Sequence, residues 1–228
     1  MAAGIARKVF GQGHAIVSAG AETATGLPIA KNAVSAAEEI GIDISAATTT
    51  DVDDLNLSEF DLIVVLQPSS AQAVRLPPNV VVDHIDVPDP YGTGLGTYRK
   101  AVGTLLKGVR RLYVRDAIRR GGVAAGSHVA GVFNRAAKQL EKELYEFVVD
   151  TLGLTVHSKI TLGQMAELLA EDAVTEGAPA ILRLSEALRR VNEHWVKVKH
   201  RDDPTKRELL SALKAVQECF LLLERTVL

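Results

Sequence analysis

The sequence lacks several features that would point directly to a function. It has a single cysteine among 228 residues, Cys219, which excludes an intramolecular disulfide and a cysteine-based metal cluster. Aromatic residues make up only 4% of the chain, so the 47% apolar content predicts an aliphatic core. The longest apolar runs, such as residues 62–66, are too short to span a bilayer. A net charge of −2 gives no general reason to expect nucleic acid as a partner.

The histidines and the N-terminal residues add two further exclusions. Four histidines are scattered without the spacing of metal ligands, so we expect neither a metal nor another cofactor: His14, His84, His128 and His157. No secretion signal precedes the first predicted helix, and we therefore expect a cytoplasmic protein without a membrane partner.

The first half of the chain alternates between helical and strand patterns. Residues 60–66 (FDLIVVL) lack alternation, so we expect a strand that is buried on both faces of a parallel sheet. Alternating elements of this kind predict an α/β domain. The predicted strands are residues 14–18 (HAIVS), 60–66 and the run from Val80. The predicted helices are residues 2–10, 29–40 and 96–120, a short one capped by Asp51 that runs through residue 57, and one from Ser69 or Ser70 to about residue 76.

The stretch from Val80 to Tyr98 holds the first candidate for chemistry. Pro88 and Pro90 bracket Asp89, and Pro90 biases Asp89 away from helical geometry. The carboxylate is therefore predicted on an extended arm beyond a strand end, where open α/β sheets bind ligands, and it could act there as an acid. The alternative is an ordinary strand-to-helix turn with Asp89 as a cap.

Four blocks of the first half together resemble one family. They are IVSAG at 16–20, GIDIS at 41–45, FDLIVVL at 60–66 and DVPDPYG at 86–92, in that order. Over residues 1–116 the chain resembles the low-molecular-weight protein tyrosine phosphatases, whose fold the related arsenate reductases share. The resemblance implies a phosphotyrosine-like phosphoester as substrate. It also implies that Asp89 is the general acid that protonates the leaving phenol and that Tyr91 lines the pocket.

The chain departs from this family at the nucleophile. Family members attack phosphorus with the thiolate of a Cys-X5-Arg loop after the first strand, whereas this sequence begins with residues that resemble the helix after that loop. Cys219 lies in a distant helical pattern and is predicted to be a core residue. Where the family often has His and Arg after the GIDIS block, Ala46 and Ala47 stand here. The arsenate-reductase branch needs redox cysteines that this chain lacks.

Two explanations for the missing loop stay open. Either Met1 is an internal methionine and a strand and loop lie upstream, or the chain is a degenerate member of the family. In the family fold, the missing strand lies between the strands at 14–18 and 60–66. Each buried backbone group left unpaired there costs about 1–3 kcal/mol. The sheet should therefore close up or borrow a strand.

The second half is predicted to be all-helical. A Gly- and Ala-rich linker at 121–126 sets the expected boundary between an α/β domain at 1–121 and a helical domain at 122–228. Short connections between amphipathic helices predict an antiparallel bundle. The predicted helices are residues 129–152, residues 161–171 behind a capping box, one that begins at Pro179, and one opened by Asp203 and Pro204.

The bundle weakly resembles HEPN-type helical domains over residues 129–226. The connection between its last two helices gathers basic side chains: His194, Lys197, Lys199, His200 and Arg201. Active HEPN ribonucleases use an Arg-X4–6-His motif. If His200 is that histidine, the arginine position falls on Trp195, which the apolar stripe needs, so nuclease activity is not expected. The alternatives are a solvated basic turn at a helix C-terminus and a phosphate- or RNA-binding patch.

The sequence thus predicts a phosphatase-like α/β domain, without its first strand, followed by an antiparallel helical bundle. Its expected function is that of a truncated or degenerate low-molecular-weight phosphatase that is inactive as it stands. Phosphomonoester hydrolysis would then require an upstream Cys-X5-Arg loop. The alternative is a non-catalytic regulatory protein whose HEPN-like bundle binds RNA, another protein or a second copy of the chain.

Overall fold

The computed structural model describes the chain from residue 1 to 227, apart from residues 12, 68–73, 121–125 and 201–203. Its contacts divide into two compact units, Met1–Arg110 and Arg111–Leu228, and each is described by itself. The division falls inside helix α4 (Leu95–Arg120). Most of the predicted linker lies outside the described residues, so the expected boundary at 121/122 stays a prediction. Among the described helices, none has both the length and the apolar content needed to cross a membrane.

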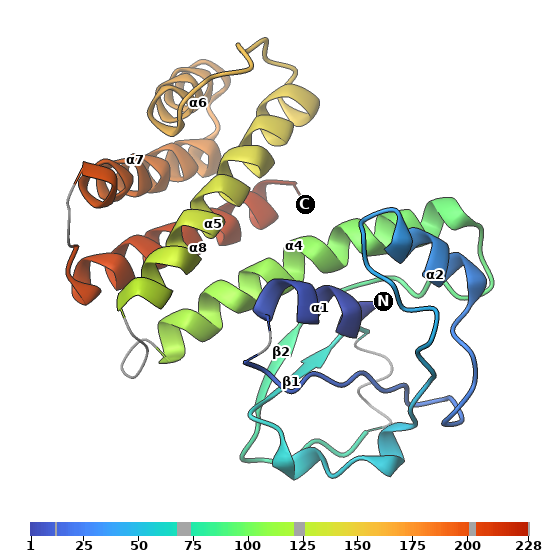
Figure 1. Cartoon of the computed structure of the whole chain (residues 1–228). Coiled ribbons are helices and arrows are strands. Elements are labelled where there is room, and N and C mark those ends of the chain that lie inside the picture. Colours follow the sequence, from blue (N-terminus) through green and yellow to red (C-terminus); the bar gives the residue numbers. More distant parts are fainter. Residues whose placement is uncertain (12, 68–73, 121–125, 201–203, 228) are drawn as a thin grey trace. The chain divides into compact units, whose positions relative to one another are not determined.

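The first unit is an α/β unit built around a small parallel sheet (Figure 1). Its strands are β1 (Leu62–Val65) and β2 (Val81–His84), paired in parallel with Leu62 opposite Val81 and Val65 opposite His84. Beyond β2, the N–H of Ile85 donates to the carbonyl of Val65 at 2.9 Å, so the pairing continues past the strand end. The expected α/β class with a parallel sheet is confirmed.

Two predictions about this sheet are wrong. Residues 14–18 form no strand, and Val17 is 49% exposed. Strand β1 is half-buried along its length instead of buried on both faces. Both differences have one cause, which is that among the described residues no strand pairs with the second edge of β1. Residues 14–18 therefore have no neighbouring strand to hydrogen-bond with, and β1 is an edge strand instead of a central one.

Helix α1 (Ala2–Phe10) forms as its spacing predicts, with Ile5 fully buried. It lies against the segment that holds the GIDIS block. A Cβ atom at Gly4 would be 2.9 Å from Cγ2 of Ile42 and 3.0 Å from Cγ2 of Ile44, so only glycine permits this close approach. The helix ends at Gly11, whose φ of 78° lies in the region that favours glycine.

The other elements of this unit are α2 (Lys31–Glu38), the 3₁₀ turns η1 (Val52–Asp54) and η2 (Leu57–Glu59), and the first half of α4. Asp51 caps η1 as predicted, since its side chain accepts a bond from the N–H of Asp53 at 3.0 Å, but the turn ends at Asp54 and not at residue 57. Most of the helix expected at residues 69–76 lies outside the described residues. Arg99 of α4 pairs with Glu39 at the end of α2 at 2.6 Å. Gly108 of α4 lies so close to Ile85 that an added Cβ would be 2.5 Å from Cγ2.

The second unit is helical, as predicted. Beside the last part of α4 it contains α5 (Gly126–Glu146), a π-helical turn η3 (Phe147–Thr151), α6 (Leu162–Glu176), α7 (Pro179–His200) and α8 (Lys206–Val227). Helix α7 packs on α6 and on α8, and α5 crosses α8 (Figure 1). Its core is mainly aliphatic, with Phe133, Phe147 and Phe220 also buried. Its largest fully buried side chains include Phe133, Leu140, Leu144, Met165, Leu169, Leu184, Leu188, Leu209 and Leu213.

Two helix starts in this unit are set by side-chain caps. Thr161 and Gln164 form the predicted capping box of α6. The prediction for α8 is wrong, because the helix begins at Lys206 and not at Pro204. Its cap is the sequence Thr-X-X-Glu: Thr205 Oγ1 accepts from the N–H of Glu208 at 3.3 Å, and Glu208 accepts from the N–H of Thr205 at 3.0 Å.

A buried polar cluster ties α4 to its neighbours within the helical unit. Arg111 donates to Glu143 at 2.8 Å and pairs with Glu224 of α8. Glu143 is 6% exposed and also accepts from Gln139 at 2.7 Å. The Arg111 guanidinium lies 5.3 Å from the ring centroid of Phe220. Removing one partner would leave a buried charge unpaired, which costs about 3–5 kcal/mol.

Candidate functional site

Asp89 lies on the loop that leads from the carboxyl end of β2 into α4. Its Oδ1 accepts a hydrogen bond from the backbone N–H of Tyr91 at 3.0 Å, a local turn of the kind that aspartate favours. The loop is tied to α2 by Asn32, whose Nδ2 donates to the carbonyl of Thr93 at 3.0 Å. The geometry therefore places the carboxylate beyond the strand end, where it is held by the backbone N–H two residues on.

Both predicted site residues of this loop face solvent. Asp89 is exposed, and Tyr91 is 78% exposed. Tyr98, at the start of α4, is buried beneath them, and its pKa is raised first by burial and then by the negative charge of Asp89. A carboxyl group in this position can donate a proton to a bound leaving group, but it cannot by itself hold a phosphoryl group.

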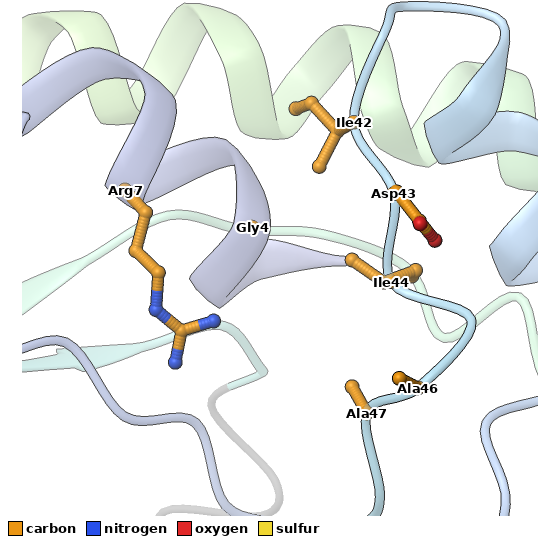
Figure 2. Close-up of a pocket in the computed structure, with 7 residues that line it drawn as sticks. All are labelled: Gly4, Arg7, Ile42, Asp43, Ile44, Ala46 and Ala47. Atoms are coloured by element: carbon orange, nitrogen blue, oxygen red, sulfur yellow. The ribbon is translucent and has the colours of Figure 1, made fainter.

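A pocket of about 290 Å³ lies between α1 and the segment after α2. Figure 2 shows its lining: Gly4, Arg7, Ile42, Asp43, Ile44, Ala46 and Ala47. The sequence did not predict this pocket. The one available signal was the pair of small residues, Ala46 and Ala47, where the family often has larger polar ones.

Each of the two charged side chains of this pocket, Arg7 and Asp43, makes hydrogen bonds to nearby residues. Arg7 Nη2 donates to the carbonyl of Ile16 at 2.7 Å. Asp43 Oδ1 accepts from the backbone N–H and from the hydroxyl of Ser45 at 2.8 and 2.7 Å, and these two bonds lower the pKa of Asp43. Two isoleucines and two alanines form most of the remaining wall, so the lining contains no thiol or other nucleophile for covalent phosphoryl transfer.

The one thiol of the chain lies in the other unit. Cys219 is fully buried in α8, as the apolar stripe predicts. Burial, together with the negative charge of Glu218, raises its pKa to about 12. A thiol with that pKa remains protonated at neutral pH and is neither a nucleophile nor a redox group.

The basic patch expected near the end of α7 is only partly described. His194 Nε2 lies 3.3 Å from the hydroxyl of Ser211, and Lys197 is exposed. The side chains of Lys199 and His200, and the whole of Arg201, lie outside the described residues. RNA or phosphate binding by this patch stays a prediction. The described residues contain no group of His, Cys, Asp and Glu that could hold a metal ion.

Comparison with known proteins places the α/β half in one family. The family model described as low molecular weight phosphotyrosine protein phosphatase matches residues 1–122, and the chain belongs to this family.

Several proteins that are similar to this chain are arsenate reductases. One from Staphylococcus aureus is 30% identical over 116 residues, 50% of this chain and 86% of that protein. A glutaredoxin arsenate reductase from Synechocystis is 29% identical over 119 residues, with the same two shares. A solved structure of an arsenate reductase in the reduced state is 27% identical to this chain, with a TM-score of 0.42. The match covers 49% of this chain and 83% of the arsenate reductase chain.

Proposed function

We propose that the α/β unit is a phosphomonoester-directed domain in which Asp89 is the general acid and Tyr91 lines the pocket. The observation that carries this proposal is the place of Asp89 within the family-matched region, on the loop at the carboxyl end of β2. Ligands of open α/β sheets bind at that edge, and a carboxyl group there can protonate a leaving alkoxide or phenoxide. The substrate class is an aryl phosphomonoester of the phosphotyrosine type.

We further propose that these 228 residues do not perform the covalent step themselves. That step needs a thiolate, an oriented cradle of donors and an arginine, as the family's Cys-X5-Arg loop supplies. The single cysteine is buried in the helical unit, with its pKa raised to about 12. Hydrolysis would therefore depend on a Cys-X5-Arg loop encoded upstream of Met1, if the natural protein has one.

Arsenate reduction is not part of this proposal, although similar proteins carry that name. Reducing arsenate to arsenite takes two electrons, which protein cysteines supply by forming a disulfide. A chain with one buried thiol cannot form that disulfide within itself. The phosphomonoester chemistry needs no such electrons and agrees with the carboxylate at Asp89.

The test is an aryl phosphate assay with the 228-residue protein, Asp89→Asn and Cys219→Ser. All three should leave p-nitrophenyl phosphate unhydrolysed above the buffer blank. If the gene encodes an upstream Cys-X5-Arg loop, the extended protein should be active and Asp89→Asn should lower its kcat by about 10²–10⁴-fold. Turnover by the 228-residue protein that Asp89→Asn abolishes would contradict the proposal.

The helical unit has no assigned activity in this proposal. Its HEPN-like character, its binding of RNA or of a second copy, and a cytoplasmic location remain predictions from the sequence. Light scattering would detect self-association, and an RNA titration at two salt concentrations would detect phosphate contacts, since their affinity falls steeply with salt.

A further inference from the structure

The helical unit contains a pocket of about 480 Å³ that the sequence did not predict. Helices α5 and α7 both pack on α8, and residues of α5 and α7 form most of the pocket wall. Ala130, Asn134 and Lys138 are four residues apart on α5 and so lie on one helix face. The rest of the wall comes from Trp195 and Val198 of α7 and from Pro204.

One part of this wall is apolar and aromatic. Trp195 was predicted to be a core residue, but it is only half-buried. Its ring centroid lies 5.6 Å from that of Phe133, which is fully buried and fixes the indole in place. Val198, Pro204 and Ala130 line the pocket with the indole, on which the flat ring of a ligand can stack.

The other part of the wall is polar and without partners. Asn134 and Lys138 are exposed, and within the described part of the chain neither side chain makes a hydrogen bond or an ion pair. One turn further along α5, Lys142 does have a partner, Glu146, at 3.7 Å. The Lys138 ammonium is therefore available to an anion, and the Asn134 amide can both donate to and accept from the edge of a base.

We propose that this pocket binds a nucleoside monophosphate. The base lies against Trp195, its edge meets the amide of Asn134, and the phosphate pairs with Lys138. The volume suits one small ligand, since such pockets span roughly 300–1,000 Å³. The site uses neither Asp89 nor the basic side chains expected near the end of α7. This proposal is therefore independent of the function proposed for the α/β unit.

The experiment uses the full chain and its only tryptophan, Trp195, as the reporter. Intrinsic fluorescence is recorded while AMP, adenosine, inorganic phosphate or phenyl phosphate is added. AMP should change the emission and saturate below about 1 mM, with adenosine at least about tenfold weaker because it lacks the phosphate. Inorganic phosphate and phenyl phosphate should give no saturable change.

Matched variants locate the phosphate. Lys138→Met should raise the Kd for AMP about tenfold and leave that for adenosine unchanged. Lys214→Met removes the same charge from an exposed position on α8 outside the pocket wall, and it should bind both ligands like the parent. Asn134→Ala should weaken both ligands, since it removes the contact with the base.

Four results would overturn the proposal. They are the absence of a saturable response to AMP, equal effects of Lys138→Met and Lys214→Met, phenyl phosphate binding as tightly as AMP, and binding of an RNA oligomer without any binding of the mononucleotide. Circular dichroism of each variant identifies loss of folding, and at both exposed lysines we expect none.

Discussion

Among single residues, Cys219 differs most clearly from what the family's chemistry requires. In a family whose chemistry depends on a thiolate, this thiol lies in the core of a helical unit and has its pKa raised to about 12. Next to it, Glu218 pairs with Arg190 at 2.7 Å, which cancels part of the negative charge that helps to raise that pKa. Cys219 acts here as a small apolar side chain.

Alkylation tests this assignment. At neutral pH the native protein should not react with iodoacetamide, because the thiol is both protonated and inaccessible, whereas it should react fully in urea. Mass spectrometry of the tryptic peptide that contains Cys219 gives the extent of modification. Rapid alkylation of the native protein would show that the thiol is exposed or ionised, and the assignment would fail.

Trp195 shows the limit of residue-level prediction. The helical stripe correctly placed it on the face of α7 that contacts the rest of the unit. A stripe gives only the direction of a side chain, and not whether the neighbouring helix reaches far enough to cover it. Because α5 covers only part of the indole, a pocket remains that no periodicity could reveal.

At the scale of elements, the C-terminal end of α4 carries a carboxylate that should affect the pH dependence of stability. Asp116 is 7% exposed and accepts from Arg119 at 2.8 Å and from Arg120 at 3.0 Å. Burial alone would raise the pKa of Asp116, but the hydrogen bonds and charges of the two arginines outweigh it, and the pKa is lowered from 3.8.

The direction of the pH effect follows from this lowered pKa. The folded state holds the proton less tightly than the unfolded state, so Asp116 contributes stability above about pH 3.8 that is lost as the pH falls through the folded pKa. Asp116→Asn should lower the free energy of unfolding by about 1–2 kcal/mol at neutral pH and flatten its decline in acid.

Urea unfolding of the parent and the variant between neutral pH and about pH 2.5 measures this effect. Asp150→Asn, at an exposed position after α5, is the matched control and should leave the curve of the parent unchanged. If the free energy of unfolding falls equally steeply with decreasing pH in the parent and in Asp116→Asn, the paired carboxylate does not cause the loss of stability in acid.

Helix boundaries in this chain were predictable where a side chain caps the helix and no competing start signal lies next to it. The box of Thr161 and Gln164 was found, but the equivalent box of Thr205 and Glu208 was missed, because Pro204 offered a competing start one residue earlier. A proline fits the first turn of a helix, but it does not satisfy the free N–H groups there, as the Thr205 hydroxyl does.

At the scale of the whole molecule, the two-stranded sheet has a measurable consequence. The backbone N–H groups of residues 15–18 make no hydrogen bonds within the described residues. Their amides should therefore exchange with deuterium within seconds, while those in the middle of α7 should exchange only on global unfolding. Hydrogen exchange read by mass spectrometry distinguishes the two. Slow exchange at residues 15–18 would mean that this segment does pair as a strand.

The fold class was predictable from the sequence because alternating elements and aliphatic stripes are local signals, and the DPYG block placed Asp89 on the correct loop. The strand expected at residues 14–18 was not predictable in this way, because a strand forms only with a partner strand, and that partner can be distant in the sequence. For the same reason the second pocket could not be predicted: Lys138 and Trp195 are remote in sequence and meet only through packing on α8.

The contact between α4 and the chain beyond β2 has a consequence for relatives of this protein. Residue 108 can present only a hydrogen atom to the Ile85 side chain, which is buried beneath it. The two positions share one fixed volume, so a larger residue at 108 demands a smaller one at 85. In an alignment of relatives that keep this packing, we expect the residues at positions 85 and 108 to covary. Their combined size would then indicate how closely the helix approaches the sheet in each relative.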